Sequence, residues 1–202
     1  SIDSFSNIFF ETMSGYTATG STILDDVESL PKSIIFWRSM THWLGGMGII
    51  VLAIAILPLL GIGGMQLFSA EVPGSGISGD KIHPRISATA KRLWLIYFGL
   101  TTLETIALSI AGMSFFDALN HSMSNIATGG FSTKNESLAY WNSIPSVQYI
   151  VIFFMILAGT NYLLIYSAMI GNFKKLFTNT EFLWYVSFIL IFVIVTYFSI
   201  YN

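Results

Sequence analysis

Cysteine is absent from this chain of 202 residues, and only 10% of its residues are charged. Without cysteine, the chain has no disulfide bond, thiolate metal site or cysteine nucleophile. Soluble domains usually carry about 25% charged residues, so the low charge predicts a membrane protein in contact with lipid. The 53% of hydrophobic residues and the mean hydropathy of +0.68 agree with this. The net charge of −2 gives no electrostatic basis for binding a nucleic acid.

The first residues also lack an initiator methionine, a basic leader and a cleavable apolar segment. The last residues stop at the end of an apolar run, without a polar tail. We therefore expect the chain to be an internal portion of a longer protein.

What the chain does contain is a near-repeat at an offset of 110 residues. Residues 13–22 and 123–132 share methionine, serine and glycine at matching positions, so that Gly20 corresponds to Gly130. Each copy follows an apolar stretch that is too short to cross a membrane and precedes one that is long enough. A short helix, a small-residue loop and a spanning helix, used twice, predict two pore loops.

The lengths of the apolar stretches support this interpretation. A spanning helix needs roughly 20 mostly apolar residues, and the stretches that meet this length are residues 37–60, 93–111, 147–170 and 182–201. Ser4–Met13 and Ser114–Met123 are helical by pattern, but about 10 residues cover only half of the hydrocarbon core. With their loops they form the expected pore segments, residues 1–22 and 114–133.

Residues near the second short helix predict where it starts. Ser114 followed by Asp117 resembles a capping box, with Ser114 as the N-cap. Gly112 is well placed to end the preceding spanning helix.

Lysine and arginine are concentrated in two connections, residues 61–92 and 171–181. Basic residues mark the cytoplasmic side of a membrane protein. We therefore expect these two connections inside the cell and the pore loops entering the membrane from outside.

The two loops have the chemistry of an ion pathway. Re-entrant backbone at membrane depth is tolerated where it is buried in protein or lines a watery cavity. There its free carbonyl groups can replace the hydration shell of a monovalent cation, and the C-terminal ends of the short helices favour a cation over an anion. The candidate ion-binding residues are small or hydroxylated: Thr17, Ala18, Thr19 and Gly20 in the first loop, and Ala127, Thr128, Gly129 and Gly130 in the second.

Several strings in this sequence resemble a known family. Residues 9–20 (Phe-Phe-Glu-Thr-Met-Ser-Gly-Tyr-Thr-Ala-Thr-Gly) resemble the first pore loop of Trk-type potassium uptake proteins, in the Trk/Ktr/HKT superfamily. Further resemblances cover the following helix, its cytoplasmic connection and the second pore loop, at residues 37–39 with 42–50, 63–68, and 120–123 with 127–133. The resemblance covers essentially the whole chain.

The resemblance implies an all-α membrane protein in which four non-identical helix–pore loop–helix repeats form a pseudo-tetrameric cation pore. This chain would supply two of the four filter loops and no cofactor beyond the transported potassium. Each repeat places one glycine in the filter, here Gly20 and Gly130, with Gly129 as an adjacent alternative. Serine at the first of these positions accompanies sodium preference in plant relatives, so Gly20 favours potassium. The family also implies a cytoplasmic (inner) membrane, a homodimer and a cytoplasmic nucleotide-binding regulatory subunit.

Five other polar residues in the apolar stretches have more than one interpretation. For Glu104 we favour a protonated or paired acid facing a neighbouring helix over an ion-pathway role, although an acid within a membrane is a functional candidate. For His42 and His121 we favour hydrogen bonds within the bundle over metal binding. Arg38 is expected to snorkel at the outer interface. Asn161 could present a polar group to the pore cavity.

Three glycines close together in one spanning stretch, Gly45, Gly46 and Gly48, predict close helix packing. The same face of that helix is also a candidate lining for the inner pore.

Uptake of potassium is the leading hypothesis for function. A sodium-permeable or other monovalent cation carrier of the same fold is the alternative, and a structural or assembly subunit is the alternative from another class. The sequence contains neither Gly-x-Ser-x-Gly nor His-Glu-x-x-His, so we do not expect an enzyme.

Overall fold

The computed structural model describes residues 4–60 and 83–200, and the side chains of residues 4–48 and 92–200. Within these ranges the chain is helical and contains no strand. The helices are, in order, α1 (Phe5–Tyr16), α2 (Lys32–Leu60), α4 (His83–Ala111), α5 (Phe115–Ile126), the 3-10 helix η1 (Ser137–Trp141), α6 (Pro145–Ala158), α7 (Tyr162–Met169), α8 (Phe173–Thr178) and α9 (Thr180–Ile200). The prediction of an all-α fold is confirmed.

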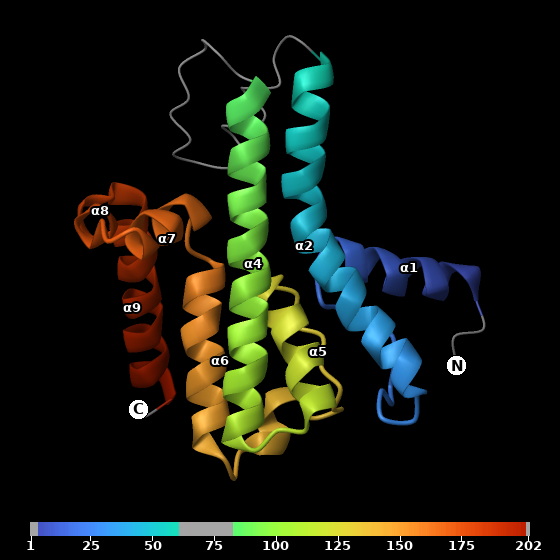
Figure 1. The fold of residues 1–202 in the computed structure, drawn as a ribbon. Coiled ribbons are helices and arrows are strands. Elements are labelled where there is room, and N and C mark those ends of the chain that lie inside the picture. Colours follow the sequence, from blue (N-terminus) through green and yellow to red (C-terminus); the bar gives the residue numbers. More distant parts are fainter. Residues whose placement is uncertain (1–3, 61–82, 201–202) are drawn as a thin grey trace. The chain divides into compact units, whose positions relative to one another are not determined.

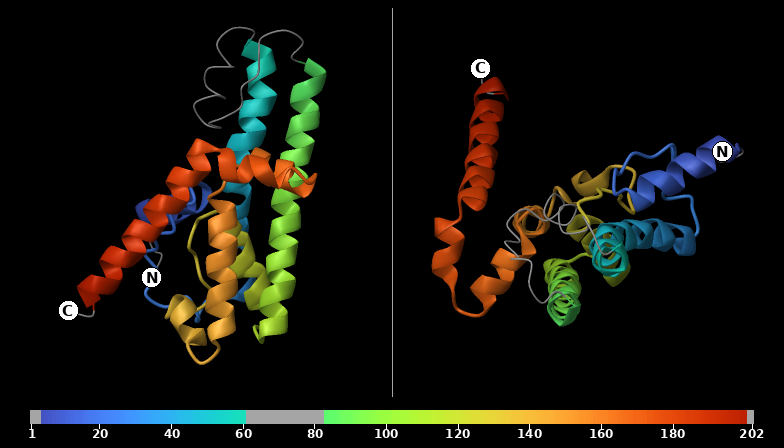
Figure 2. Two further views of the ribbon diagram at one scale, coloured as in Figure 1. Left: turned by 90° about the vertical axis from the view of Figure 1, so that its left-hand side faces the viewer. Right: turned by 90° about the horizontal axis from the view of Figure 1, so that it is seen from above.

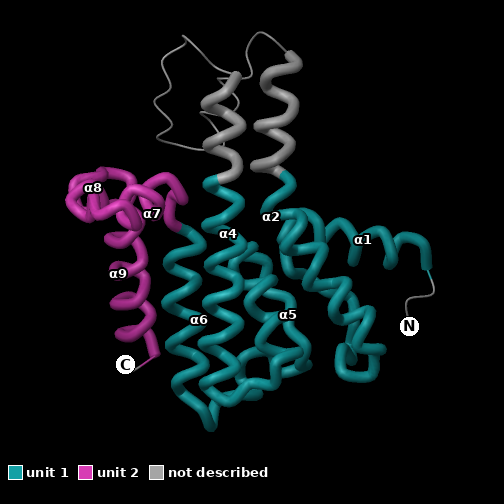
Figure 3. Tube along the Cα trace, viewed as in Figure 1, with its two compact units in different colours: residues 1–159 teal, residues 160–202 magenta. Residues whose placement is uncertain are grey.

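The chain divides into two units, residues 1–159 and residues 160–202 (Figure 3). In the first unit, the short helix α5 packs against three longer neighbours, α2, α4 and α6 (Figure 1). The other short helix, α1, packs on α2 and points away from the rest of the unit when the unit is viewed from above (Figure 2). In the second unit, α7 packs on α8 and α8 on α9.

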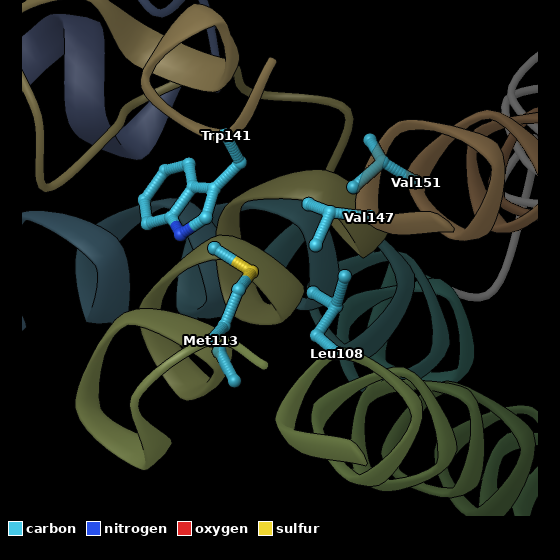
Figure 4. Packing of buried hydrophobic residues seen from close by; sticks show 6 residues of the cluster. Leu108, Met113, Trp141, Val147 and Val151 are labelled. Carbon is cyan, nitrogen blue, oxygen red and sulfur yellow. The ribbon is translucent and has the colours of Figure 1, made fainter. Parts of the chain in front are cut away.

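A cluster of buried apolar side chains holds the surroundings of α5 together. Figure 4 shows side chains from the end of α4, the connection to α5, η1 and α6 converging on one another. The members of the cluster are Leu108, Met113, Ala118, Trp141, Val147 and Val151. Because lipid tails are as apolar as these side chains, close packing rather than escape from water stabilises such a contact in a membrane.

The start of α5 agrees with the sequence. α4 ends at Ala111, Gly112 has a φ of 112°, and the N–H of Met113 donates to the carbonyl of Leu108 at 3.1 Å. This bond pattern ends a helix with a left-handed residue, where glycine avoids a side-chain clash. The Oγ of Ser114 accepts from the N–H of Asp117 at 3.1 Å. Both the helix end at Gly112 and the Ser114 cap are therefore confirmed.

Several boundaries differ from the sequence-based expectation. The expected single helix over residues 147–170 is two helices, because α6 ends at Ala158 and Asn161 caps a new helix by accepting from the N–H of Leu163 at 3.0 Å. The expected loop over 171–181 contains the short helix α8. The connection expected over 61–92 contains the beginning of α4 from His83 onward, and its first part, up to residue 82, lies outside the described residues.

Two described segments are long and apolar enough to cross a membrane, Arg92–Ala111 and Thr180–Ile200. The pair α6 and α7 would add a third if the two helices count as one broken span. The side chains of residues 49–60, in the last part of α2, lie outside the described part of the chain.

Candidate pore loops

The two loops leave their short helices in the same way. In the first, the N–H of Thr19 donates to the carbonyl of Ser14 at 3.0 Å. In the second, the N–H of Gly129 donates to the carbonyl of Ser124 at 2.8 Å. A bond that spans five residues is the signature of a Schellman helix end. Both short helices therefore stop by one local mechanism, at positions that match in the repeat.

The backbone angles of the loops also repeat. Ala18 and Thr128 have φ values of 52° and 56°, although neither is a glycine. Two residues further on, Gly20 and Gly130 have φ values of 77° and 90°. In backbone conformation, the structural partner of Gly20 is thus Gly130 and not Gly129.

The loops lie against each other although 110 residues separate them in the chain. A side-chain carbon added to Gly20 would overlap the carbonyl oxygen of Gly129 and would lie 3.6 Å from the Cα of Gly130. The close approach brings candidate residues from both loops together, which no single copy of the motif could predict.

Hydroxyl groups tie the first loop to its own helix. Thr17 Oγ1 lies 2.7 Å from the carbonyl of Met13 and 2.8 Å from Thr19 Oγ1. Ser14 Oγ donates to the carbonyl of Ser21 at 2.5 Å. The first loop is therefore held at both ends by bonds to α1.

The second loop is anchored through two histidines. His42 on α2 bonds through Nδ1 to Ser124 Oγ at 2.9 Å and stacks on the ring of Phe131, with centroids 3.9 Å apart. His121 on α5 bonds through Nε2 to Ser132 Oγ at 3.0 Å. Hydrogen bonding by both histidines within the bundle is confirmed. No group of three His, Asp or Glu side chains suited to hold a metal ion occurs in the described part of the chain.

The side chain of Arg38 does not snorkel, and that expectation is wrong. Its side chain is buried and pairs with Glu11 of α1, with Nη2 and Oε1 2.8 Å apart. Its guanidinium lies over the ring of Phe131, 4.1 Å from the centroid. A buried charge needs a partner, and the sequence did not reveal that Glu11 is that partner.

Glu104 faces a neighbouring helix, as expected. It is fully buried, and its Oε1 accepts from Asn125 Nδ2 at 2.6 Å. The same Nδ2 lies 3.3 Å from the carbonyl of Val151. Asn125 thus connects the end of α5 to α4 and α6.

Glycines of α2 allow the loops to approach that helix. A side-chain carbon on Gly45 would overlap the carbonyl oxygen of Tyr16, and one on Gly46 would lie 3.2 Å from the Cα of Ala127. At Gly48 nothing lies within 4 Å of such a carbon. Two of the three glycines therefore serve packing.

The two segments that directly follow the loops are bonded to each other, outside the apolar helices. Asn135 accepts at Oδ1 from the N–H of Val27 at 2.7 Å and donates from Nδ2 to Asp26 at 2.8 Å, which holds the pKa of Asp26 below its ordinary value. Lys134 pairs with Glu28 at 3.1 Å, which raises the pKa of Lys134.

Of the remaining candidate residues, Asn161 lies in the second unit and caps α7. Thr17, Thr19, Thr128 and Gly130 are exposed, whereas Ala127 and Gly129 are buried.

The contacts of Glu11, Arg38 and Phe131 were missed by sequence reasoning. The signal in the sequence was Arg38 itself, because a charged residue in an apolar stretch usually pairs with another charged group.

Two half-length helices that end in matching, mutually touching loops of small residues define a membrane protein with re-entrant pore loops. The TrkH family, described as "Cation transport protein", has a model that matches residues 2–201, and the chain belongs to this family.

Relatives support this membership. The chain is 52% identical over 169 residues to the Trk system potassium uptake protein TrkH of Salmonella typhimurium, covering 84% of this chain and 35% of that protein. It is 39% identical over 199 residues to the Trk system potassium uptake protein TrkG of Escherichia coli, covering 98% of this chain and 41% of that protein. The chain therefore spans about a third of the length of the curated TrkH relatives it matches.

The fold is similar to a solved structure, the crystal structure of the potassium transporter TrkH from Vibrio parahaemolyticus. The TM-score is 0.77 at 39% identity, over 95% of this chain and 38% of that one.

Proposed function

We propose that this chain forms part of a potassium uptake protein and supplies two of four filter loops around one pathway. The observation that carries the proposal is the repeated φ pattern of Ala18/Gly20 and Thr128/Gly130, in loops that touch one another. The potassium uptake named for the relatives supports the choice of ion.

The carbonyl groups of residues 17–20 and 127–130 are the proposed potassium ligands, with Gly20 and Gly130 as the filter glycines. A left-handed residue turns the backbone so that successive carbonyls are not taken up by a helix ladder. Carbonyl oxygens replace the hydration shell of a monovalent cation without any charged side chain. The negative ends of α1 and α5 add to the attraction for a cation.

In this proposal the protein lies in the cytoplasmic membrane with the pore loops facing outside and residues 61–92 and 171–181 inside. Two further repeats complete the pore, and the protein works as a homodimer with a cytoplasmic nucleotide-binding subunit. The words "Trk system" in the names of the relatives support a system of several components.

The test is potassium-dependent growth of an uptake-deficient bacterium carrying the full-length protein that contains this sequence. We expect rescue by the parent, and weakened rescue or lost preference for potassium over sodium in Gly20→Ser and Gly130→Ser. Uptake of sodium as well as potassium by cells that carry the parent would favour a less selective cation carrier. Equal rescue by parent and both variants would show that the loops only pack.

A further inference from the structure

A buried ion pair connects α1 to α2 next to the outgoing end of the first loop. The side chains of Arg38 and Glu11 are only 6% and 11% exposed. Glu11 also accepts from Thr22 Oγ1 at 3.0 Å and from the N–H of Ile23 at 3.2 Å, and Arg38 Nη2 donates to Thr22 Oγ1 at 3.1 Å. The ion pair therefore holds Thr22 and Ile23, which lie just after the proposed filter residues of the first loop.

The same arginine reaches the second loop. Its guanidinium covers the buried ring of Phe131, which directly follows Gly130. That ring also stacks on His42 at an interplanar angle of 12°, and His42 bonds to Ser124 at the base of the second loop. The contacts thus run without a break from Ile23 to Ser124.

We propose that Arg38 is a positioning residue that couples the two filter loops, and that this coupling sets the preference for potassium over sodium. The inference rests on the proposed function. Discrimination between cations depends on how many carbonyls surround the ion and how they are held. A link that fixes one loop relative to the other limits how far their carbonyls can relax toward a smaller ion.

The geometry requires arginine rather than any cation. A guanidinium is planar, stacks on an aromatic face and carries several donors in a fixed arrangement, whereas an ammonium is a strongly hydrated point charge. Arg38 Nη1 has no hydrogen-bond partner among the described residues, so the face of Phe131 is part of what compensates its burial. Lysine would keep the charge and lose this contact.

The experiment measures potassium and sodium uptake, together with the amount of protein in the membrane, for variants of the full-length protein. Arg38→Lys tests the stack with the charge retained. The double variant Glu11→Gln with Arg38→Met removes both charges, so neither is left buried without a partner. Lys134→Gln is the matched control, because the exposed pair Lys134–Glu28 also joins the segments that follow the two loops.

We expect Arg38→Lys and the double variant to reach the membrane, and their potassium preference to fall several-fold. Lys134→Gln should keep the parent's preference. Parent preference in both Arg38 variants, alongside altered preference in Gly20→Ser, would overturn this inference and leave the proposed function standing. Reduced protein amount with parent preference in the molecules that remain would show a structural role only and would also overturn it. If Gly20→Ser is silent as well, the proposed function itself fails.

Discussion

In the second loop segment, the short helix α5 buries seven residues between three neighbouring helices, whereas in the first, α1 buries only Ser14 and Gly15. Large apolar side chains of α1 remain exposed, among them Phe5 at 82%. Even so, the two loops have nearly the same φ angles at matching positions. Similar backbone in such different surroundings indicates that the helix end and its sequence set the loop conformation locally.

The anchors of the two segments differ in kind. The first is fastened to α2 by a buried ion pair, Arg38–Glu11. The second is fastened by hydrogen bonds in which no lysine or arginine takes part, such as Asn125 with Glu104 and His42 with Ser124. The common conformation is local, but what holds each loop in its place is specific to its own neighbours, and substitutions can separate the two contributions.

The largest expected effect distinguishes the two proposed filter glycines, Gly20 and Gly130. A side-chain carbon at Gly130 meets no atom within 4 Å, so Gly130→Ala destabilises the fold only through its left-handed φ, by about 1–2 kcal/mol. Gly20→Ala has the same cost from its left-handed φ, and its side-chain carbon also overlaps the carbonyl of Gly129. This overpacking destabilises the fold further, by about 1–3 kcal/mol. Thermal unfolding of the full-length protein in detergent should therefore show a lower midpoint for Gly20→Ala than for Gly130→Ala. Equal midpoints would mean that the loops do not touch as described.

The next effect concerns the polar anchor of the second segment. Glu104→Ala removes the acceptor 2.6 Å from the amide of Asn125, which then has only the carbonyl of Val151 at 3.3 Å, and it empties the space of a fully buried side chain. Together these losses cost about 1–3 kcal/mol. Glu104→Gln keeps a side-chain oxygen at the same length and should cost less. The same unfolding measurement checks this order. A glutamine variant as unstable as the alanine variant would show that the carboxyl group itself is required.

Much of the helical framework could be predicted because it depends on local signals. Apolar length indicated α9, the glycine and serine before α5 indicated its boundary, and the repeat indicated both loops. Gly20 and Gly130 also carried a signal, since glycine favours a positive φ. Ala18 and Thr128 share that conformation without any such signal, so the sequence alone could not show it.

The two failures have different causes. Residues 147–170 are uncharged and mostly apolar, and apolar length alone says nothing of a break where Asn161 caps a second helix. Arg38 was assigned to the interface because its partner, Glu11, lies on another helix. A pair of charges separated along the chain becomes visible only once α1 and α2 are packed together.

A smaller effect sharpens the comparison at the start of the two short helices. Ser4 and Ser114 are both N-caps at matching positions, but only Ser114 makes a side-chain capping bond. Ser114→Ala should therefore cost about 1 kcal/mol, and Ser4→Ala clearly less. Unfolding midpoints of the two variants test the difference. A reversed order would show that the caps do not contribute as their geometry indicates.

The smallest effect lies where the two segments are joined, at Asp26 and Asn135. The amide of Asn135 lowers the pKa of Asp26 in the folded protein from its ordinary 3.8. Folding thus favours the carboxylate, so its stabilising contribution is fully present above pH 3.8 and is lost as the pH falls through the lowered pKa. Asp26→Asn should be slightly less stable than the parent at neutral pH, and the difference should shrink in acid. In an Asn135→Ala background, which lacks the donor amide, the same substitution should have a smaller effect, because only the N–H groups of Glu28 and Ser29 and the hydroxyl of Ser29 still lower the pKa of Asp26. A difference that is as large in that background as in the parent, or one that grows in acid, would show that the Asn135 amide is not the main group that stabilises the carboxylate.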